Sequence, residues 1–205
     1  MKRYTREEQR LLAVWAADCA ERVLPLFEKM RPKDKRPREA IKACRRWVRT
    51  GIFRMADIRK ASLGAHSAAR EAAREAKGGG VACFAARKAG REAKAGRVVC
   101  FAARAAGRKA KDGGVACFAA RAAGHSVATA HVPEHAFGSS YYAIKALEAA
   151  DSTSEASRRA RIARELSWQW RHLPKVLRKG WQEWQARKLP KAMRKRWREF
   201  LKKRK

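Results

Sequence analysis

A tandem repeat of 17 residues constrains this chain more than any other feature of its sequence. Four consecutive units span residues 64–131, and the last three share the string V-x-C-F-A-A-R. A match of this length indicates tandem duplication, so the units should share one local structure. Each unit contains about a dozen residues that favour helix, followed by glycine-rich punctuation (Gly78–Gly80, Gly96, Gly113–Gly114). The pattern predicts a short helix of about 18 Å and a tight turn in each unit.

Small residues form the face of each unit that should be buried. In the second unit the alanines lie opposite Arg87 and Arg91 on a helical wheel. Glycine fills the tenth position (Gly90, Gly107, Gly124), where it would let helix axes approach closely. We therefore expect an all-α fold: amphipathic helices over about 4–30 and 37–50, and then a stack of short antiparallel Ala-rich helices over 56–150.

A second repeat, with a period of 16, lies near the C-terminus. The segments that begin at Trp168 and Trp184 share the frame W-Q-x-R-[HK]-L-P-K-x-[LM]-R-K-x-W. Pro174 and Pro190 should each begin a short helix, because proline is tolerated in a first turn. The tryptophans (Trp168, Trp181, Trp184, Trp197) could pack against the helical stack or stack on nucleic-acid bases. We favour packing, because Trp is costly to leave in water.

A change of composition near residues 150–157 predicts a boundary. Small polar residues there separate a helical bundle over 1–150 from a basic, Trp-rich and Pro-punctuated extension over 151–205. The chain has 51 Lys and Arg against 19 Asp and Glu, a formal net charge of +32, and half of that charge lies in residues 158–205. Such a balance indicates a polyanion, an anionic surface or a strongly acidic protein as the partner.

Cations recur at fixed positions of the 17-residue unit. Arg fills the seventh position in all four units and the eleventh in three. If adjacent short helices present these positions on one face, the cations form a patch that follows a phosphate backbone. The C-terminal run RKRWREFLKKRK is expected to contact a polyanion as well. The predicted nucleic-acid-binding residues are Arg70, Arg74, Arg87, Arg91, Arg104, Arg108, Arg121, Arg187, Lys188, Lys191, Arg194, Lys195, Arg196, Arg198, Lys202, Lys203, Arg204 and Lys205.

Cysteine and histidine share one position of the repeat, which raises the question of a metal site. Cys83, Cys100 and Cys117 occupy the position that His66 fills in the first unit. In an antiparallel stack, alternate units place that position at opposite ends, so the four side chains cannot surround one ion. We interpret these cysteines as small buried hydrophobic residues.

A second group of histidines lies between residues 125 and 135. His125, His131, Glu134 and His135 could converge across a turn, although Pro133 prevents a regular helical pair of ligands. We favour packing and helix-end hydrogen bonds over a metal or catalytic site. The chain also lacks a Walker-type loop and a nucleophile elbow. We therefore expect no enzymatic activity, no cofactor and no metal.

The N-terminal segment predicts the compartment. Asp18, Glu21 and Arg22 interrupt its apolar pattern, which is typical of an amphipathic helix and not of a signal peptide. We therefore expect a cytoplasmic protein whose five cysteines are reduced thiols. No apolar run approaches the roughly 20 residues that a membrane span needs.

Three segments, at 15–28, 36–51 and 122–147, are followed by the W-Q-x-R-x-L-P element. Together they resemble a family of small, all-helical bacterial and archaeal proteins labelled as immunity proteins of toxin systems. The resemblance implies an Ala-rich helical bundle with a toxin-neutralising role and no catalytic residues. The chain departs from the family pattern in its extra 17-residue units, its doubled Trp/Leu-Pro element and its strong positive charge.

These departures favour a family scaffold with a surface for nucleic acid. Our first hypothesis is a non-enzymatic protein that binds DNA or RNA through phosphate contacts without sequence-specific readout. The alternative is an immunity or inhibitor protein that binds an acidic protein partner through the same cations. An anionic membrane is the least favoured partner, although the C-terminal run mixes cations with Trp and Phe.

Overall fold

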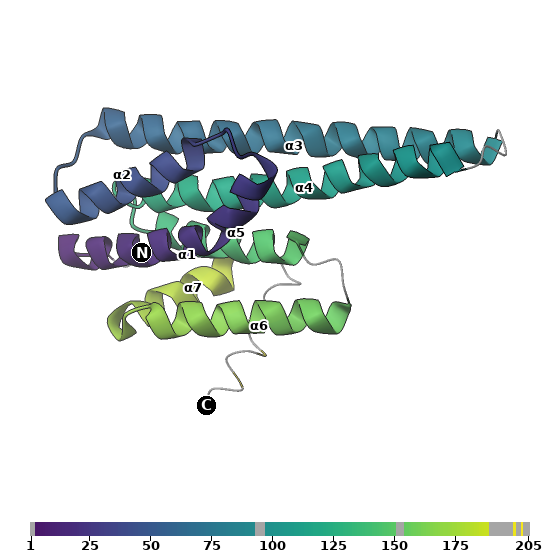
Figure 1. The fold of residues 1–205 in the computed structure, drawn as a ribbon. Coiled ribbons are helices and arrows are strands. Elements are labelled where there is room, and N and C mark those ends of the chain that lie inside the picture. The colour runs from purple at the N-terminus through teal and green to yellow at the C-terminus, as the bar shows by residue number, and fades with distance from the viewer. Residues whose placement is uncertain (1–2, 93–96, 151–153, 189–198, 200–201, 203–205) are drawn as a thin grey trace.

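Helices make up the regular structure of the described part of the chain. The computed structural model describes residues 3–92, 97–150 and 154–188 with Glu199 and Lys202, and it describes side chains there except at 79–112 and 188. No strand occurs within these ranges, so the predicted all-α bundle is confirmed (Figure 1). The elements are α1 (Arg6–Met30), α2 (Arg36–Thr50), α3 (Met55–Glu92), α4 (Arg97–Ala128), α5 (His135–Ala150), α6 (Glu155–His172), the 3₁₀ helix η1 (Lys175–Leu177) and α7 (Arg178–Lys188).

Local signals explain where the first two helices begin and end. Thr5 and Glu8 form a capping box, in which each side chain accepts a hydrogen bond from the other residue's backbone N–H. Pro37 lies in the first turn of α2, where its missing N–H costs nothing. Gly51 ends α2 in the left-handed conformation, with φ of 68°. Both helices therefore lie close to their predicted ranges.

The prediction of one short helix and turn per repeat unit was wrong. Helix α3 continues through Gly78–Gly80 and α4 continues through Gly113–Gly114, so each long helix holds most of two units. The turn expected at Gly96 lies outside the described residues. The two long helices run side by side and extend past α5 and α6 (Figure 1).

Close packing explains why glycine lies inside a helix at residue 113. A Cβ atom on Gly113 would lie 2.6 Å from the carbonyl oxygen of Ala72 and 2.9 Å from the Cβ of Ala76. This glycine therefore lets α3 and α4 approach each other, and the cost in helix propensity is only about 1 kcal/mol.

Gly113 and Gly114 offer a matched pair of substitutions. Gly113→Ala is expected to lower the free energy of unfolding by about 1–3 kcal/mol, because its methyl group would clash with α3. Gly114→Ala meets nothing within 4 Å and is expected to raise that free energy by about 0.5–1 kcal/mol. Urea denaturation followed by circular dichroism measures both effects. Changes of the same sign would contradict the close approach at Gly113.

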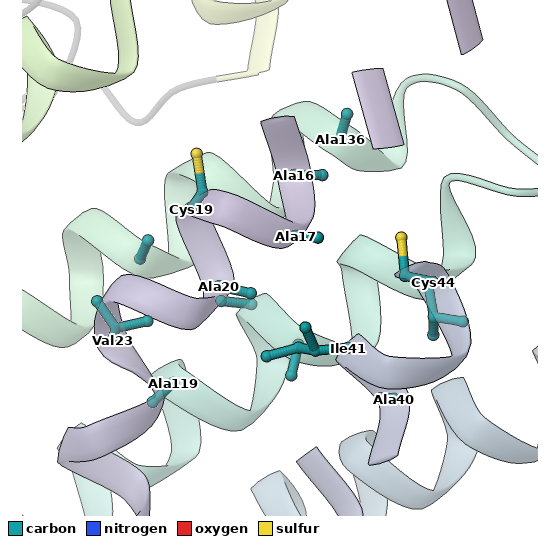
Figure 2. Packing of buried hydrophobic residues seen from close by; sticks show 14 of the residues in the cluster. Ala16, Ala17, Cys19, Ala20, Val23, Ala40, Ile41, Cys44, Ala119 and Ala136 are labelled. Atoms are coloured by element: carbon teal, nitrogen blue, oxygen red, sulfur yellow. The ribbon is translucent and has the colours of Figure 1, made fainter. Parts of the chain in front are cut away.

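Alanine dominates the buried contacts between helices, as predicted. Figure 2 shows Ala16, Ala17 and Ala20 of α1 in one buried cluster with Ile41 of α2, Ala119 of α4 and Ala136 of α5. The buried alanines of the long helices include Ala65, Ala68, Ala69 and Ala72 of α3 and Ala116, Ala119, Ala120 and Ala123 of α4. Side chains this small allow short distances between helix axes.

The cysteines with described side chains behave as buried hydrophobic residues. Cys19, Cys44 and Cys117 are free thiols and are buried, which confirms the interpretation of Cys117. Burial raises the pKa of the Cys44 thiol to about 12, so it stays protonated. The side chains of Cys83 and Cys100 lie outside the described part of the structure.

The C-terminal helices pack on α1 and α5 through their tryptophans. Trp181 is fully buried, and its ring meets that of Trp15 edge-on at 5.3 Å. The indole N–H of Trp15 donates to the backbone oxygen of Gln169 at 2.9 Å. Pro174 caps η1, as expected, and Leu177 of that helix is buried. Packing of the tail is therefore confirmed for Trp181, whereas Pro190 and Trp197 lie outside the described residues.

Among the described residues, none of the helices has a stretch that is both long and apolar enough to cross a bilayer.

Candidate interaction surface

Several arginines on the α1–α2 side of the bundle are paired with carboxylates. Arg45 of α2 contacts Asp18 at 2.5 Å and Glu21 at 2.8 Å on α1. Arg36 contacts Glu71 of α3 at 2.5 Å, and Arg31 contacts Glu75 one turn further along α3 at 2.7 Å. These pairs neutralise the edge of α3 that faces α2.

Hydrogen bonds from arginine lower the pKa of three carboxylates on this side of the bundle. The Arg36 guanidinium holds the pKa of Glu71 down at about 2, mainly through the direct hydrogen bond. The same guanidinium lowers the pKa of Asp34, and Arg38 lowers that of Glu28. The pairs therefore persist at neutral pH, and their cations are already engaged.

The outward side of α3 presents cations without such partners. Arg59, Lys60, Arg70, Arg74 and Lys77 are exposed, and within the described residues none of them forms an ion pair with a carboxylate. All except Lys60 lie within about 60° of one another around the helix, given 100° per residue. We call these five residues the α3 cationic stripe.

The predicted binding residues fall into three groups. Arg70 and Arg74 belong to the α3 cationic stripe, and Arg187 and Lys202 are also exposed. Arg121 is half-buried and donates to the Tyr142 hydroxyl at 3.1 Å. The remaining side chains lie outside the described part: Arg87, Arg91, Arg104, Arg108, Lys188, Lys191, Arg194, Lys195, Arg196, Arg198, Lys203, Arg204 and Lys205.

The long helices change how equivalent repeat positions are oriented. Seventeen residues of a continuous helix make about 4.7 turns, so equivalent positions on one helix differ by about 100° in direction. In the α3 cationic stripe, Arg74 and Lys77 instead follow Arg70 by four and seven residues, and Arg59 precedes it by eleven. Arg59 and Lys60 were not among the predicted binding residues, because both precede the first repeat unit; the spacing of eleven residues between Arg59 and Arg70 indicates that they share a helix face.

Four histidines form a chain between α3, α4 and α5, behind the α3 cationic stripe. The His66 ring meets the His125 ring edge-on, with 5.2 Å between centroids. His125 Nδ1 and His135 Nδ1 are 3.1 Å apart, a hydrogen bond in which one ring donates and the other accepts. The His131 ring lies 5.2 Å from that of His135. Packing is therefore confirmed for His125, His131 and His135, and a side-chain hydrogen bond for His125 with His135.

Two glycines make room for the imidazole rings. A Cβ on Gly124 would lie 3.0 Å from the His66 ring, and a Cβ on Gly138 would lie 2.7 Å from His125 Nδ1. His66 was not predicted to join this group, because its contact with His125 depends on the register between α3 and α4. Gly124, at the tenth position of the last unit, was the residue in the sequence that indicated a close neighbour there.

Burial keeps the histidine chain uncharged. Desolvation, the largest cause, lowers the pKa of His125 to about 3 and that of His135 to about 4. The pKa of His66 is also lowered, by burial and then by Arg121 and Arg70. Among the described residues, no three His, Cys, Asp or Glu side chains are placed to hold a metal ion. The Glu134 carboxylate lies 3.9 Å from the Arg187 guanidinium.

Fold and surface together define the class of protein: an Ala-rich helical bundle with an open cationic face. The chain belongs to the family described as "Imm-5 like putative immunity protein", whose model matches residues 2–96 and 91–176. The two matched segments meet inside the 17-residue repeats. The family resemblance seen in the sequence is therefore confirmed. No curated protein and no solved structure matches the chain.

Proposed function

We propose that this chain is an immunity-type protein that binds an acidic protein partner through the α3 cationic stripe. The observation that carries the proposal is the contrast between two edges of α3: Glu71 and Glu75 beside α2 are paired with Arg36 and Arg31, whereas the cations on the outward side form no such pairs in the described residues. Unpaired charge on a rigid helix can steer an oppositely charged partner and set its orientation. Family membership supports a protein partner.

Charge reversal within the α3 cationic stripe tests this function. Arg70→Glu with Arg74→Glu is expected to weaken binding of the acidic partner at least about tenfold, because attraction becomes repulsion. The partner is first isolated as a stoichiometric complex from nuclease-treated cells and identified by mass spectrometry. Its affinity for each purified variant is then measured by calorimetry.

A matched control separates the effect of the α3 cationic stripe on binding from the effect of net charge. Arg171→Glu with Lys175→Glu makes the same change of net charge at exposed positions of α6 and η1, and α6 lies on the opposite side of the bundle from α3 (Figure 1). This control should bind within about twofold of the unaltered chain. Equal weakening by both variants would rule out the stripe as the site. The lack of any stoichiometric acidic partner would overturn the proposed function.

Nucleic-acid binding is the second candidate function. It is favoured by the formal charge of +32 and by exposed Arg70, Arg74 and Arg187. The probe is a 20-base-pair duplex DNA of random sequence. Log affinity should then fall with log salt by about 0.9 for each phosphate neutralised. A flat response to salt would eliminate this candidate.

A further inference from the structure

One end of the bundle exposes a group of large apolar side chains. Ile52 is 63% exposed, Phe53 36%, Met55 42% and Leu63 54%. All four lie between residues 52 and 63, in the α2–α3 connection and the first turns of α3. Isolated exposed apolar residues are ordinary, but a contiguous group of them marks an interaction site. We call these four residues the apolar tip.

The backbone and aromatic contacts hold the connection in place. Gly51 ends α2 in the left-handed conformation, and the Ile52 N–H donates to the Thr50 hydroxyl at 3.2 Å. The Arg6 guanidinium lies 5.5 Å from the centroid of the Phe53 ring and 5.0 Å from that of the buried Trp47. The apolar tip is thus tied to α1 and α2 and is pre-organised for binding.

Cations surround the apolar tip. The chain from residue 46 to residue 63 carries five cations and a single acid, Asp57. Within the described residues none of these cations forms an ion pair with a carboxylate: Arg46, Arg49, Arg54, Arg59 and Lys60. Arg10 of α1 adds a further charge, since its guanidinium lies beside Gly51. A partner that covers the tip must therefore supply carboxylates around an apolar surface.

The apolar tip continues into the α3 cationic stripe. Met55, Arg59 and Leu63 are four residues apart, so each follows the last by about 6 Å along nearly the same side of the helix. Arg70 and Arg74 continue on that side. Tip and stripe together form one surface about 33 Å long, from Met55 to Lys77.

We propose that the apolar tip anchors the acidic protein partner. The tip inserts into an apolar depression on the surface of that partner, and Asp and Glu side chains of the partner border the depression. This inference rests on the proposed function and assigns the part of the surface that holds the partner most firmly. A second copy of this chain does not fit, because two chains of +32 repel each other. Phosphate backbone does not fit either, because it offers no apolar surface to Ile52, Met55 and Leu63. Interface anchors are typically apolar or aromatic side chains surrounded by polar groups, as here.

Two labelled peptides of equal negative charge test the anchor against the full chain. One peptide combines Glu with Leu and Phe; in the other, Ser replaces every Leu and Phe. The unaltered chain should bind the apolar acidic peptide at least about tenfold more tightly by fluorescence anisotropy. Hydrogen exchange of the bound chain should show protection at residues 50–56 for that peptide alone.

Matched variants complete the test. Ile52→Ser, Met55→Gln and Leu63→Gln together remove the three most exposed side chains of the apolar tip. The contact between the Phe53 ring and the Arg6 guanidinium is kept. This variant should lose the preference for the apolar peptide while it still binds the Ser peptide. Val176→Ser, at a position 59% exposed in η1, should keep the preference. Circular dichroism confirms that each variant is folded.

The outcomes separate this inference from the proposed function. Equal binding of both peptides by the unaltered chain, or a preference that survives in the triple variant, overturns the anchor and leaves the cationic stripe standing. Failure of both peptides to bind, together with salt-sensitive binding of the 20-base-pair duplex, overturns both proposals.

Discussion

Replacement of Trp181 with Ala is expected to lower the free energy of unfolding by about 3–5 kcal/mol. Trp181 is the fully buried aromatic residue of α7, and it contacts Trp15 of α1 and Trp170 of α6 through its ring. Removing the indole leaves a cavity between these helices. Urea denaturation, followed by circular dichroism at 222 nm, measures the loss.

Val176→Ala is the matched control for this substitution. Val176 lies five residues earlier, in η1, and is 59% exposed, so its truncation should change the free energy of unfolding by less than about 0.5 kcal/mol. A change below about 1 kcal/mol for Trp181→Ala would show that the C-terminal helices do not form part of the cooperative core. Hydrogen exchange would then show α6 and α7 opening while α3 and α4 stay protected.

Acidification from pH 7 to pH 5 is expected to destabilise the fold through the histidine chain. The folded-state pKa is about 3 for His125 and about 4 for His135, whereas an unfolded histidine titrates near 6.5. Below pH 6.5 the unfolded chain therefore binds protons that the folded chain does not. The stabilisation is fully present above pH 6.5 and is lost as the pH falls toward the folded-state values. Well below pH 6.5, each further pH unit costs about 1.4 kcal/mol for each such histidine.

The pH range over which stability is lost distinguishes the contribution of the histidines from that of the carboxylates. Glu71 has a folded-state pKa of about 2, so its contribution is lost only as the pH falls through about 4 toward 2. Urea midpoints at pH 7, 6 and 5 consequently report on the histidines. His125→Phe keeps an aromatic ring against Tyr142, 5.2 Å away between centroids, and should reduce the slope with pH. An unchanged slope in this variant would show that His125 binds protons equally well in the folded and unfolded chains.

The arrangement of charge separates two roles for the arginines. Arg36 and Arg45 join α1, α2 and α3 through short contacts to carboxylates, so they stabilise the bundle. Arg70 and Arg74 lie one turn apart, each about 100° around α3 from the paired glutamate that follows it, and have no such contacts in the described residues. The first group can be substituted only at a cost to packing, whereas the second can change with little effect on the fold.

Features that depend on near neighbours in the chain could be predicted from the residues alone. Thr5 and Glu8 mark the start of α1, Pro37 the start of α2, and Gly51 the end of α2, because capping involves only residues within a turn. Alanine patterning was enough to predict buried helix–helix contacts. The match of motifs along 15–147 was enough to indicate the family.

Which glycines form turns and which side chains are in contact depends on how the helices pack against one another. Gly113 looked like a turn residue, yet it lies inside α4, where the missing Cβ leaves room for the backbone of α3. His66 meets His125 through the register between α3 and α4, which no local pattern encodes. Equivalent repeat positions diverge for the same reason: Arg70 is exposed on α3, while Arg121 turns toward Tyr142 of α5. Seventeen residues are not a whole number of helical turns, so duplication preserved the sequence of each unit but not the direction of its side chains.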